Sequence, residues 1–391
     1  MSRSSYGIII VGVLFFIFGF VTWLNGSLIP YLKELCDLSD FEALFVTFSF
    51  YIAYSVMALP MSYLLDRLGY KRGMALGLVV MSVGSLLFIP SALSGEYLLF
   101  LLALFVLATG LTILQSASNP YIVYLGDIAS ATRRISIMGI INKLAGVLAP
   151  MLFALLVTID SDDKTAMASD LIAPYAGMAV VLASLVLLVR LLPAIEHEVS
   201  GVNARSKSVL DHPHAILGAV ALFFYVGIEV IAGDTIGLYA QSLGEENFSV
   251  FTSYTMLAMV VGYLFGIVLT PRYIDASRAL ALFSLLGVVL TFAIITLSPN
   301  AYLVALLGLS NAIVWPAIWQ LSLGGVGDLA KRVSALLIIA IAGGAILPLL
   351  YGKLSQVVGM QSSYSLGLIC YTIILLYAIK WHKARSWSEV W

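Results

Sequence analysis

The sequence predicts an all-α membrane protein with twelve transmembrane helices, arranged as two pseudo-symmetric bundles of six. Three observations predict this fold class. Of the 391 residues, 61% are hydrophobic and only 10% are charged, whereas soluble domains average about 25% charged residues. Apolar stretches long enough to cross a bilayer follow one another along the whole chain. Landmark residues of the first half recur in the second half in the same order.

Composition also excludes several classes of protein. The mean hydropathy of +1.03 excludes a soluble enzyme with a single membrane anchor. The net charge of −1 offers no basic surface for nucleic acid. Cys36 and Cys370 lie in different halves, so they support neither a disulfide framework nor a zinc site. The first apolar run is long enough to span a bilayer and has no small-residue cleavage site behind it, which favours a retained helix over a signal peptide.

Twelve apolar stretches are separated by short polar turns. Crossing a hydrocarbon core of about 30 Å takes roughly 20 helical residues. We place the helices near 8–30, 43–65, 73–91, 97–121, 136–158, 174–193, 215–240, 250–270, 279–298, 301–324, 335–352 and 363–381.

The positive charges predict the orientation. On this layout one side of the membrane holds sixteen of the twenty Lys and Arg residues. The opposite turns hold Lys33, Lys164 and Lys353, and Lys143 lies inside a helix. Because cytoplasmic loops carry an excess of Lys and Arg, we expect both termini to be cytoplasmic and the protein to reside in the cell (inner or plasma) membrane.

The chain divides into an N-terminal bundle at 1–193, a cytoplasmic linker at 194–214, and a C-terminal bundle with its tail at 215–391. All four histidines fall in loops or in the tail on the cytoplasmic side. The sequence has no Gly-Lys-Ser/Thr phosphate loop and no metal-spaced His or Cys cluster. We therefore expect no enzyme activity, no cofactor and no metal other than a coupling ion, and nothing implies an obligate protein partner.

The two halves repeat each other. Phe15 to Gly19 aligns with Phe223 to Gly227 at an offset of 208 residues, and Pro120 and Pro316 lie in the fourth and tenth helices. Two six-helix repeats related by a pseudo-two-fold axis are the architecture of the major facilitator superfamily. We expect the two prolines to break their helices at matching heights.

The turn after the second helix reads Asp-Arg-Leu-Gly-Tyr-Lys-Arg at 66–72 and fits that superfamily's signature between helices 2 and 3. A carboxylate and several cations can bridge helix ends in one conformation and separate in another. We predict a cytoplasmic gate there. The alternative is that these charges only fix topology. The candidate gate residues are Asp66, Arg67, Lys71, Arg72, Arg134 and Arg332.

Away from the helix ends, three charged residues lie inside predicted helices: Lys143, Glu229 and Asp234. A charge in the hydrocarbon region is costly, so it persists mainly where it faces a wet cavity or a partner. Glu229 and Asp234 point about 140° apart at 3.6 residues per turn, which predicts different roles. We expect Glu229 to bind solute or cation and Asp234 to bind the coupling ion. Lys143 is a candidate charge partner, or it snorkels toward the interface.

Amide and indole side chains follow helical spacing in two further helices. Asn311, Trp315 and Trp319 stand at i, i+4 and i+8 with Gln320 beside them, and Gln115 and Asn119 stand at i and i+4. Amides hydrogen-bond hydroxyls, and indole faces cover the C–H face of a sugar ring. This pattern favours a sugar site over packing or an interfacial belt.

Several segments resemble the fucose:proton symporter family, which includes bacterial glucose/galactose permeases and resembles sodium-dependent glucose transporters. They are Phe-Gly-Phe-Val-Thr-Trp-Leu-Asn-Gly at 18–26, Leu-Ile-Pro at 28–30, Gln-Ser-Ala-Ser-Asn-Pro-Tyr at 115–121, and Arg-Ile-Ser-Ile-Met-Gly-Ile-Ile-Asn at 134–142. The resemblance implies hexose import coupled to a cation. It adds Asn25 and Asn142 to the sugar-binding candidates.

Two positions depart from that family. Gly26 and Gln115 stand where the fucose permease has the carboxylates linked to proton coupling and sugar binding. The internal repeat pairs Gly26 with Asp234 at the same offset of 208. Our hypothesis is that the coupling carboxylates have moved to the second half. The loss of the proton-linked pair favours sodium over the proton as the coupling ion.

Other functions stay open at this point. An uncoupled sugar facilitator would never concentrate its solute. An exporter of small amphipathic compounds would need a more apolar cavity than these Asn, Gln and Trp residues suggest. A non-transporting sugar sensor would bind sugar without flux.

Overall fold

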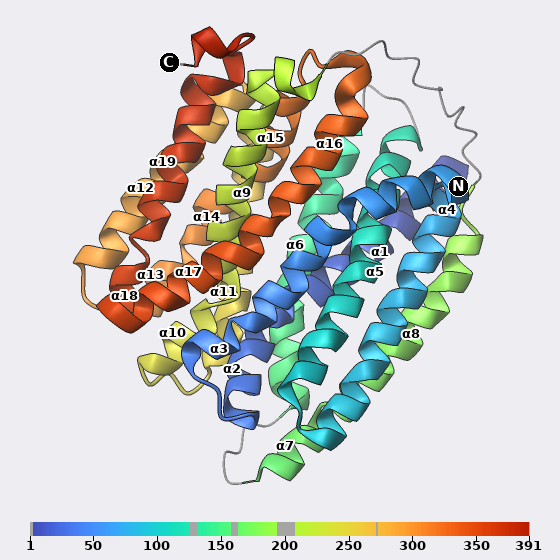
Figure 1. Ribbon diagram of the computed structural model, residues 1–391, viewed down its shortest axis with the longest axis vertical. Helices are drawn as coiled ribbons and strands as arrows, with labels where there is room; N and C mark the ends of the chain where they lie inside the picture. The colour runs from blue at the N-terminus through green and yellow to red at the C-terminus, as the bar shows by residue number, and fades with distance from the viewer. Residues whose placement is uncertain (1–2, 126–130, 158–162, 194–207, 271–272, 391) are drawn as a thin grey trace. The chain divides into compact units, whose positions relative to one another are not determined.

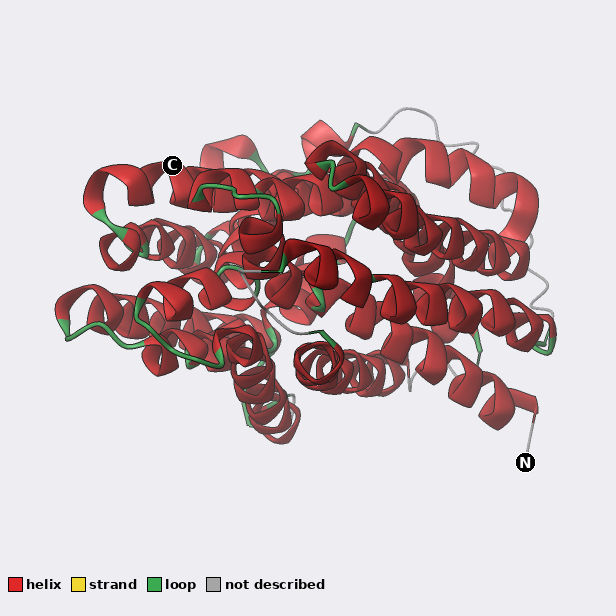
Figure 2. Ribbon diagram, turned by 90° about the horizontal axis from the view of Figure 1, so that it is seen from below, coloured by secondary structure: helices red, strands yellow, loops and turns green. Residues whose placement is uncertain are grey.

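The structure is a computed structural model, and it describes residues 3–125, 131–157, 163–193, 208–270 and 273–390. The chain separates into two compact units, Met1–Val199 and Ser200–Trp391. Within the described residues every regular element is a helix (Figure 2). The predicted linker at 194–214 falls largely outside those residues, so its extent stays a prediction.

The described residues of the first unit form eight α-helices, which Figure 1 labels. They are α1 (Arg3–Trp23), α2 (Asn25–Leu35), α3 (Asp40–Ala43), α4 (Phe45–Ser94), α5 (Tyr97–Tyr124), α6 (Ala131–Leu156), α7 (Lys164–Asp170) and α8 (Ile172–Arg190). In Figure 1, α5 and α8 run alongside α4. The described part of this unit contains six helical segments long and apolar enough to span a membrane.

The second unit holds six further spanning segments among its described residues. Its helices are α9 (Pro213–Gly233), α10 (Ile236–Ser242), α11 (Phe251–Leu269), α12 (Ala276–Thr296), α13 (Ala301–Ala305), α14 (Leu307–Asn311), α15 (Val314–Leu323), α16 (Ala330–Ile339), α17 (Gly343–Val358), α18 (Met360–Ser363) and α19 (Leu366–Ile379). Twelve spanning segments confirm the number predicted from hydropathy. Their orientation stays a prediction.

Glycines hold neighbouring helices close in the first unit. A Cβ built on Gly77 would lie 2.7 Å from the carbonyl oxygen of Gly110, and one built on Gly110 would lie 2.5 Å from the backbone nitrogen of Met81. Helices in lipid associate through such close backbone approaches, because the hydrophobic effect does not drive them together there. The small residues of α4 and α5 therefore set the packing of this hairpin.

The connection between the second and third spans is tighter than predicted. A turn over 66–72 was expected, but helical structure runs through α4 on both sides of a single non-helical residue, Gly69, with φ +71° and ψ 169°. Left-handed φ favours glycine, because a Cβ would clash with the backbone there. One residue therefore separates the two spans, and four of the predicted gate residues, Asp66, Arg67, Lys71 and Arg72, lie on the helix ends beside it.

The predicted proline breaks are half right. Helix α5, which forms the fourth span, continues through Pro120 to Tyr124, so no break occurs there. The tenth span is interrupted between α14 and α15, where Ala312 has φ −61° and ψ −107°. A proline ring clashes with the carbonyl four residues earlier, and Ala312 lies four residues before Pro316. The break therefore falls one turn before the proline rather than at it.

Candidate functional site

The predicted gate residues do not share one environment. Lys71 Nζ donates to the carbonyl oxygen of Leu192 at 2.8 Å, just beyond the end of α8. Arg134 is buried, and its Nε donates to the carbonyl oxygen of Ile122 at 2.9 Å in the last turn of α5. Both cations satisfy carbonyls at or just beyond helix C-termini, which lack partners within the helix.

The other gate candidates are more exposed. The side chains of Asp66, Arg67 and Arg72 are exposed in the first unit, and Arg332 is exposed in the second. The local roles of Lys71 and Arg134 support a structural function for those two positions. Whether the set opens and closes as a gate stays a prediction.

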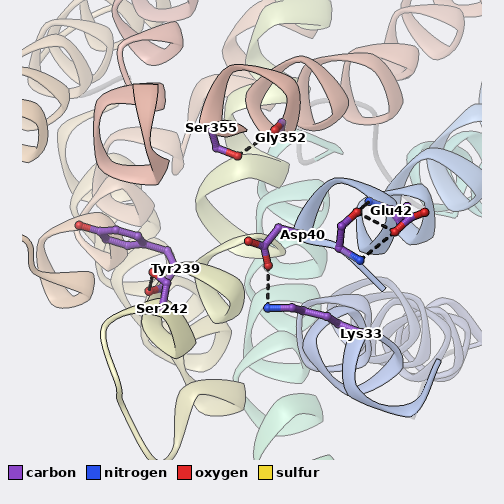
Figure 3. A network of polar contacts seen from close by, with 8 residues as sticks. Lys33, Asp40, Glu42, Tyr239, Ser242, Gly352 and Ser355 are labelled. Carbon is purple, nitrogen blue, oxygen red and sulfur yellow. Dashed lines mark hydrogen bonds and ion pairs between the residues drawn. The ribbon is translucent and has the colours of Figure 1, made fainter. Parts of the chain in front are cut away.

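Charged groups around the α2–α3 corner pair locally. Lys33 Nζ lies 2.7 Å from Asp40 Oδ1, and Ser39 with Glu42 forms a capping box at the start of α3 (Figure 3). Figure 3 also shows Ser242 and Ser355 bonded to carbonyls three residues back, those of Tyr239 and Gly352. The Lys33–Asp40 pair is partly exposed and contributes about 1 kcal/mol at most. These contacts shape helix ends and lie apart in sequence from every predicted site residue.

A cluster of hydrogen-bond donors gathers in the first unit where α1 meets α6. Trp23 ends α1, Asn25 begins α2 after the interruption at Leu24, and Asn142 and Lys143 lie within α6. Lys143 Nζ lies 4.2 Å from the centroid of the Trp23 ring, a cation–π contact. A Cβ on Gly19 would collide with the carbonyl of Asn142, so the two backbones touch at this level.

Three of these donors are buried without a hydrogen-bond acceptor in the described structure. They are Trp23 Nε1, Asn25 Nδ2 and Asn142 Nδ2, in residues exposed by 3%, 2% and 6%. A buried donor without an acceptor costs about 1–3 kcal/mol. Such a cluster is suited to a ligand that brings oxygen acceptors, and it contains two of the predicted residues, Asn25 and Asn142.

Gln115 and Asn119 lie four residues apart on the uninterrupted helix α5, as predicted, and both are half-buried. Their common face follows from the 3.6-residue repeat. The structure leaves their proposed contact with solute as a prediction.

In the second unit, Glu229 lies within α9 and is 7% exposed. It lies close enough to interact electrostatically with Tyr225, Tyr263 and Tyr371, which come from α9, α11 and α19. Tyr225 and Tyr371 donate their hydroxyl protons to Asn311, so of these three tyrosines Tyr263 is the one whose proton is not given to that residue. A charge in a membrane span needs polar neighbours of this kind. The carboxylate predicted to be functional in this helix is therefore buried and has tyrosines near it, while its function stays a prediction.

The same tyrosines hold Asn311. Tyr371 OH donates to Asn311 Oδ1 at 2.8 Å, and Tyr225 OH donates to the Asn311 carbonyl at 3.1 Å. Asn311 Nδ2 is buried without an acceptor in the described structure. The amide oxygen is thus fixed by the protein, and the amide N–H₂ group is the part available to a ligand.

Trp315 and Trp319 lie on one face of α15, with ring centroids 5.7 Å apart. Tyr225 lies 6.4 Å from Trp315 by ring centroids. The break at Ala312 separates Asn311 from the two tryptophans, so helical spacing no longer places Asn311 on their face, and the predicted shared stripe stays a prediction. Gln320 is exposed, while the indoles are half-buried. Tyr225 nevertheless contacts both Asn311 and Trp315.

Asp234 follows the last residue of α9 and is fully buried, with 0% exposure. It lies in the interruption between α9 and α10, next to the buried Thr235. The sequence placed it within a continuous helix, and the structure places it at the point where that helix ends. Glu229 and Asp234 therefore have different surroundings, as their spacing predicted.

Sequence reasoning missed Trp23, the tyrosines near Glu229, and the buried Thr252 and Thr255 of α11. Tyr225 carried a usable signal, because it precedes Glu229 by four residues in one helix. Nothing in the spacing of the chain's 20 tyrosines distinguishes Tyr263 and Tyr371 from the rest. Trp23 carried a usable signal, because it precedes Asn25 by two residues within a segment that had already been singled out.

Comparison with known proteins finds relatives that match this protein along nearly its whole length. The family model described as Major Facilitator Superfamily matches residues 11–347. A glucose/galactose transporter of Brucella abortus is 34% identical over 394 residues, covering 97% of this chain and 95% of the relative. A putative glucose/galactose transporter of Helicobacter pylori is 34% identical over 393 residues, covering 95% of this chain and 96% of the relative.

A solved structure supports the same fold. The crystal structure of the Escherichia coli fucose:proton symporter matches with a TM-score of 0.77 at 23% identity, covering 96% of this chain and 98% of that one. The relatives are named as transporters or symporters and not as enzymes. With its twelve spanning segments and these matches, the chain is a multi-pass membrane protein that belongs to the major facilitator superfamily.

Proposed function

We propose that this protein imports a monosaccharide of the hexose class across the cell membrane together with a cation, by alternating access. Whole-length similarity to proteins named glucose/galactose transporters supports sugar as the substrate class. The observation that carries the proposal is the buried position of Glu229 near Tyr225, Tyr263 and Tyr371. A membrane-embedded carboxylate of this kind is typical of an ion or substrate pathway.

The polar groups of both units suit a neutral polyol. Buried amide donors of Asn25, Asn142 and Asn311 lack acceptors within the described protein, and sugar hydroxyls and the ring oxygen supply acceptors. The paired indoles of Trp315 and Trp319 offer apolar faces to the C–H side of a ring. An exporter of amphipathic compounds would gain little from buried amide donors.

Glu229 is assigned to coupling and sugar binding, and Asp234 to the coupling ion. Gly26 and Gln115 carry no charge at the first-half positions where the fucose permease has carboxylates, so the ionisable groups within the second unit's spans are the candidates. We favour sodium over the proton, because Asp234 is buried beside Thr235 where α9 ends and the proton-linked pair is missing.

The first experiment measures transport by purified protein in proteoliposomes. Counterflow with labelled glucose, galactose, mannose and N-acetylglucosamine identifies the substrate. The Glu229→Gln variant should fail to accumulate that sugar, because the neutral amide lacks the negative charge that binds the coupling cation. It should still exchange sugar across the membrane. Accumulation by Glu229→Gln at the wild-type level would overturn the coupling role.

A second experiment identifies the cation. Uptake is compared at fixed pH in sodium buffer and in choline buffer of equal ionic strength. Sodium coupling predicts loss of accumulation in choline, whereas unchanged accumulation rules sodium out. Exchange without accumulation in every buffer would indicate an uncoupled facilitator, and sugar binding without any flux would indicate a sensor.

A further inference from the structure

The seventh transmembrane span is interrupted deep inside the second unit. Helix α9 ends at Gly233 and α10 begins at Ile236, which leaves Asp234 and Thr235 between them. Both residues are 0% exposed. The last carbonyls of a helix have no partner within it and carry the negative end of its dipole. An interrupted helix inside a membrane protein is where transporters place their ion sites.

Threonine hydroxyls cross-link this interruption. Thr252 Oγ1 donates to the carbonyl of Gly233 at 2.7 Å, and Thr255 Oγ1 donates to the carbonyl of Ala232 at 3.0 Å. Thr235 Oγ1 donates to the carbonyl of Ile231 at 2.7 Å. All three threonines are exposed by 1% or less. Each hydroxyl gives its proton to a carbonyl, so its oxygen lone pairs stay available to accept or to coordinate a cation.

Two further buried hydroxyls lie at the same place. Tyr364 follows α18 and is 0% exposed, and Tyr239 in α10 is 2% exposed. Their rings lie 5.5 Å apart by centroids, and Tyr364 is adjacent to Thr235. The Tyr364 hydroxyl lies near Thr235 and Tyr351, and the Tyr239 hydroxyl lies near the backbone of Asn300. The two phenols add buried polar oxygen beside the interruption.

These groups have one chemistry in common, since all present oxygen atoms. The set contains one carboxylate, the hydroxyls of Thr252 and Thr255, and the carbonyl end of α9. Calcium sites collect several carboxylates, and the described residues contain no group of three or more His, Cys, Asp or Glu side chains able to hold a metal ion. One negative charge with neutral oxygens matches a monovalent hard cation.

We propose that Asp234, with the hydroxyl oxygens of Thr252 and Thr255 and the carbonyl end of α9, forms a sodium site. This inference deepens the proposed cation coupling and rests on it. Sodium at this position bridges the last turn of α9, the interruption and α11. A bound sodium ion thus holds α9 and α10 in one arrangement. An ion that binds one arrangement better than the other shifts the conformational equilibrium toward it.

The test measures sodium binding to the full-length protein without sugar. Thermal unfolding of the purified protein is followed as NaCl replaces choline chloride at constant ionic strength. A ligand that binds only the folded state raises Tm with its concentration. Wild type should show a saturable rise in Tm. Asp234→Asn should show none, because it removes the charge that neutralises the ion.

Matched threonine variants separate ligation from folding. Thr252→Val removes the oxygen and should weaken sodium binding, so that the half-saturating sodium concentration rises about tenfold. Thr252→Ser keeps the oxygen and should bind sodium like wild type. Thr291→Val is the control, since Thr291 in α12 is equally buried but lies outside the interruption. Its basal Tm can change, but its sodium response should not.

The outcomes distinguish this site from the proposed transport function. A sodium response in Asp234→Asn equal to wild type would place the ion elsewhere and overturn the site. A wild-type protein that moves sugar without a sodium response would also overturn the site and leave sugar transport standing. A sodium response that follows the variants, in a protein that moves no sugar, would support the site and refute sugar import.

Discussion

At the scale of single residues, the second unit's chemistry depends on hydroxyl groups that fix other polar atoms. Tyr371 OH donates to Asn311 Oδ1 and accepts from Ser310 Oγ at 3.2 Å. The network leaves the Asn311 N–H₂ group as the free side of the amide. A buried network of this kind specifies one orientation of each member, because alternatives leave polar atoms unsatisfied.

Tyr371→Phe should reduce both stability and sugar affinity. The change leaves Asn311 Oδ1 without its donor, at a cost of about 1–3 kcal/mol, and lets the amide rotate. Thermal unfolding and the concentration dependence of counterflow measure the two effects. Tyr302→Phe is the control, because Tyr302 is 53% exposed. Wild-type affinity and Tm in Tyr371→Phe would contradict the assigned role.

Cys36 offers a residue-scale test that depends on pH. It lies outside the spanning segments, and burial raises the pKa of its thiol to about 11. Only the thiolate reacts with a maleimide. Labelling should therefore be slow near pH 7 and rise about tenfold per pH unit up to pH 10. The Cys370→Ser variant assigns the label to Cys36, and a rate that levels off below pH 9 would contradict the buried setting.

At the scale of elements, contacts at helix ends and between helices determine where each helix begins and how it packs against its neighbours. Asp275 is the N-cap of α12, and its Oδ1 accepts from the Arg278 backbone N–H and the Ser277 hydroxyl, both at 2.8 Å. These hydrogen bonds, the Arg278 N–H first, hold the pKa of Asp275 below its usual value. A cap of this kind stabilises the start of its helix.

Asp275→Ala should lower the free energy of unfolding by about 1 kcal/mol. Because the folded pKa is depressed, this contribution is complete above the unfolded pKa and is lost as pH falls through the folded pKa. Asp275→Ser keeps an acceptor and should retain most of the stability without the pH dependence. Thermal unfolding at pH 7 and at low pH measures both. Equal stability of the Ala and Ser variants would refute the cap.

The internal repeat has a counterpart in helix packing. Gly19 of α1 meets the carbonyl of Asn142 in α6, and Gly227 of α9 meets the side chain of Leu347 in α17. The two glycines are the residues that the sequence repeat aligns. In each unit, therefore, the first span approaches the fifth at the same glycine.

Gly19→Val should disrupt folding more severely than Gly227→Val. Its Cβ meets three backbone atoms of Asn142, whereas a Cβ on Gly227 meets side-chain atoms of Leu347, of which Cδ1 can move by a change of rotamer while Cβ, at 2.7 Å, requires a small shift of the helix. Gly177→Val is the control, because no atom lies within 4 Å of a Cβ built there. Yield of folded protein by size-exclusion chromatography ranks the variants. Wild-type yield from Gly19→Val would contradict the close contact.

At the scale of the whole molecule, the distribution of cations predicts the orientation. The sixteen Lys and Arg residues assigned to one side lie mainly in the short turns that govern insertion. Green fluorescent protein fused after Trp391 should fluoresce, because it folds in the cytoplasm and not in an oxidising compartment beyond the membrane. A dark fusion that is expressed at normal level would reverse the topology.

Most of the fold was predictable because its signals are local. Each span is a continuous apolar stretch, and lipid requires such a stretch to be helical. The same locality explains the errors. The sequence contains Pro120 and Pro316, but only the structure shows that α5 continues through the first and that the tenth span breaks at Ala312. Neighbouring helices decide whether a proline is accommodated or breaks its helix.

By itself, the sequence determined the spanning segments, the repeat and the charged residues within the spans, including Glu229 and Asp234. The tertiary structure alone decided their partners. Tyr263 and Tyr371 come from two other helices, α11 and α19, to lie near Glu229, and Thr252 and Thr255 reach across from α11 to the end of α9. Hydropathy acts on each segment independently, whereas hydrogen bonds between segments depend on how helices rotate against one another, which no single segment encodes.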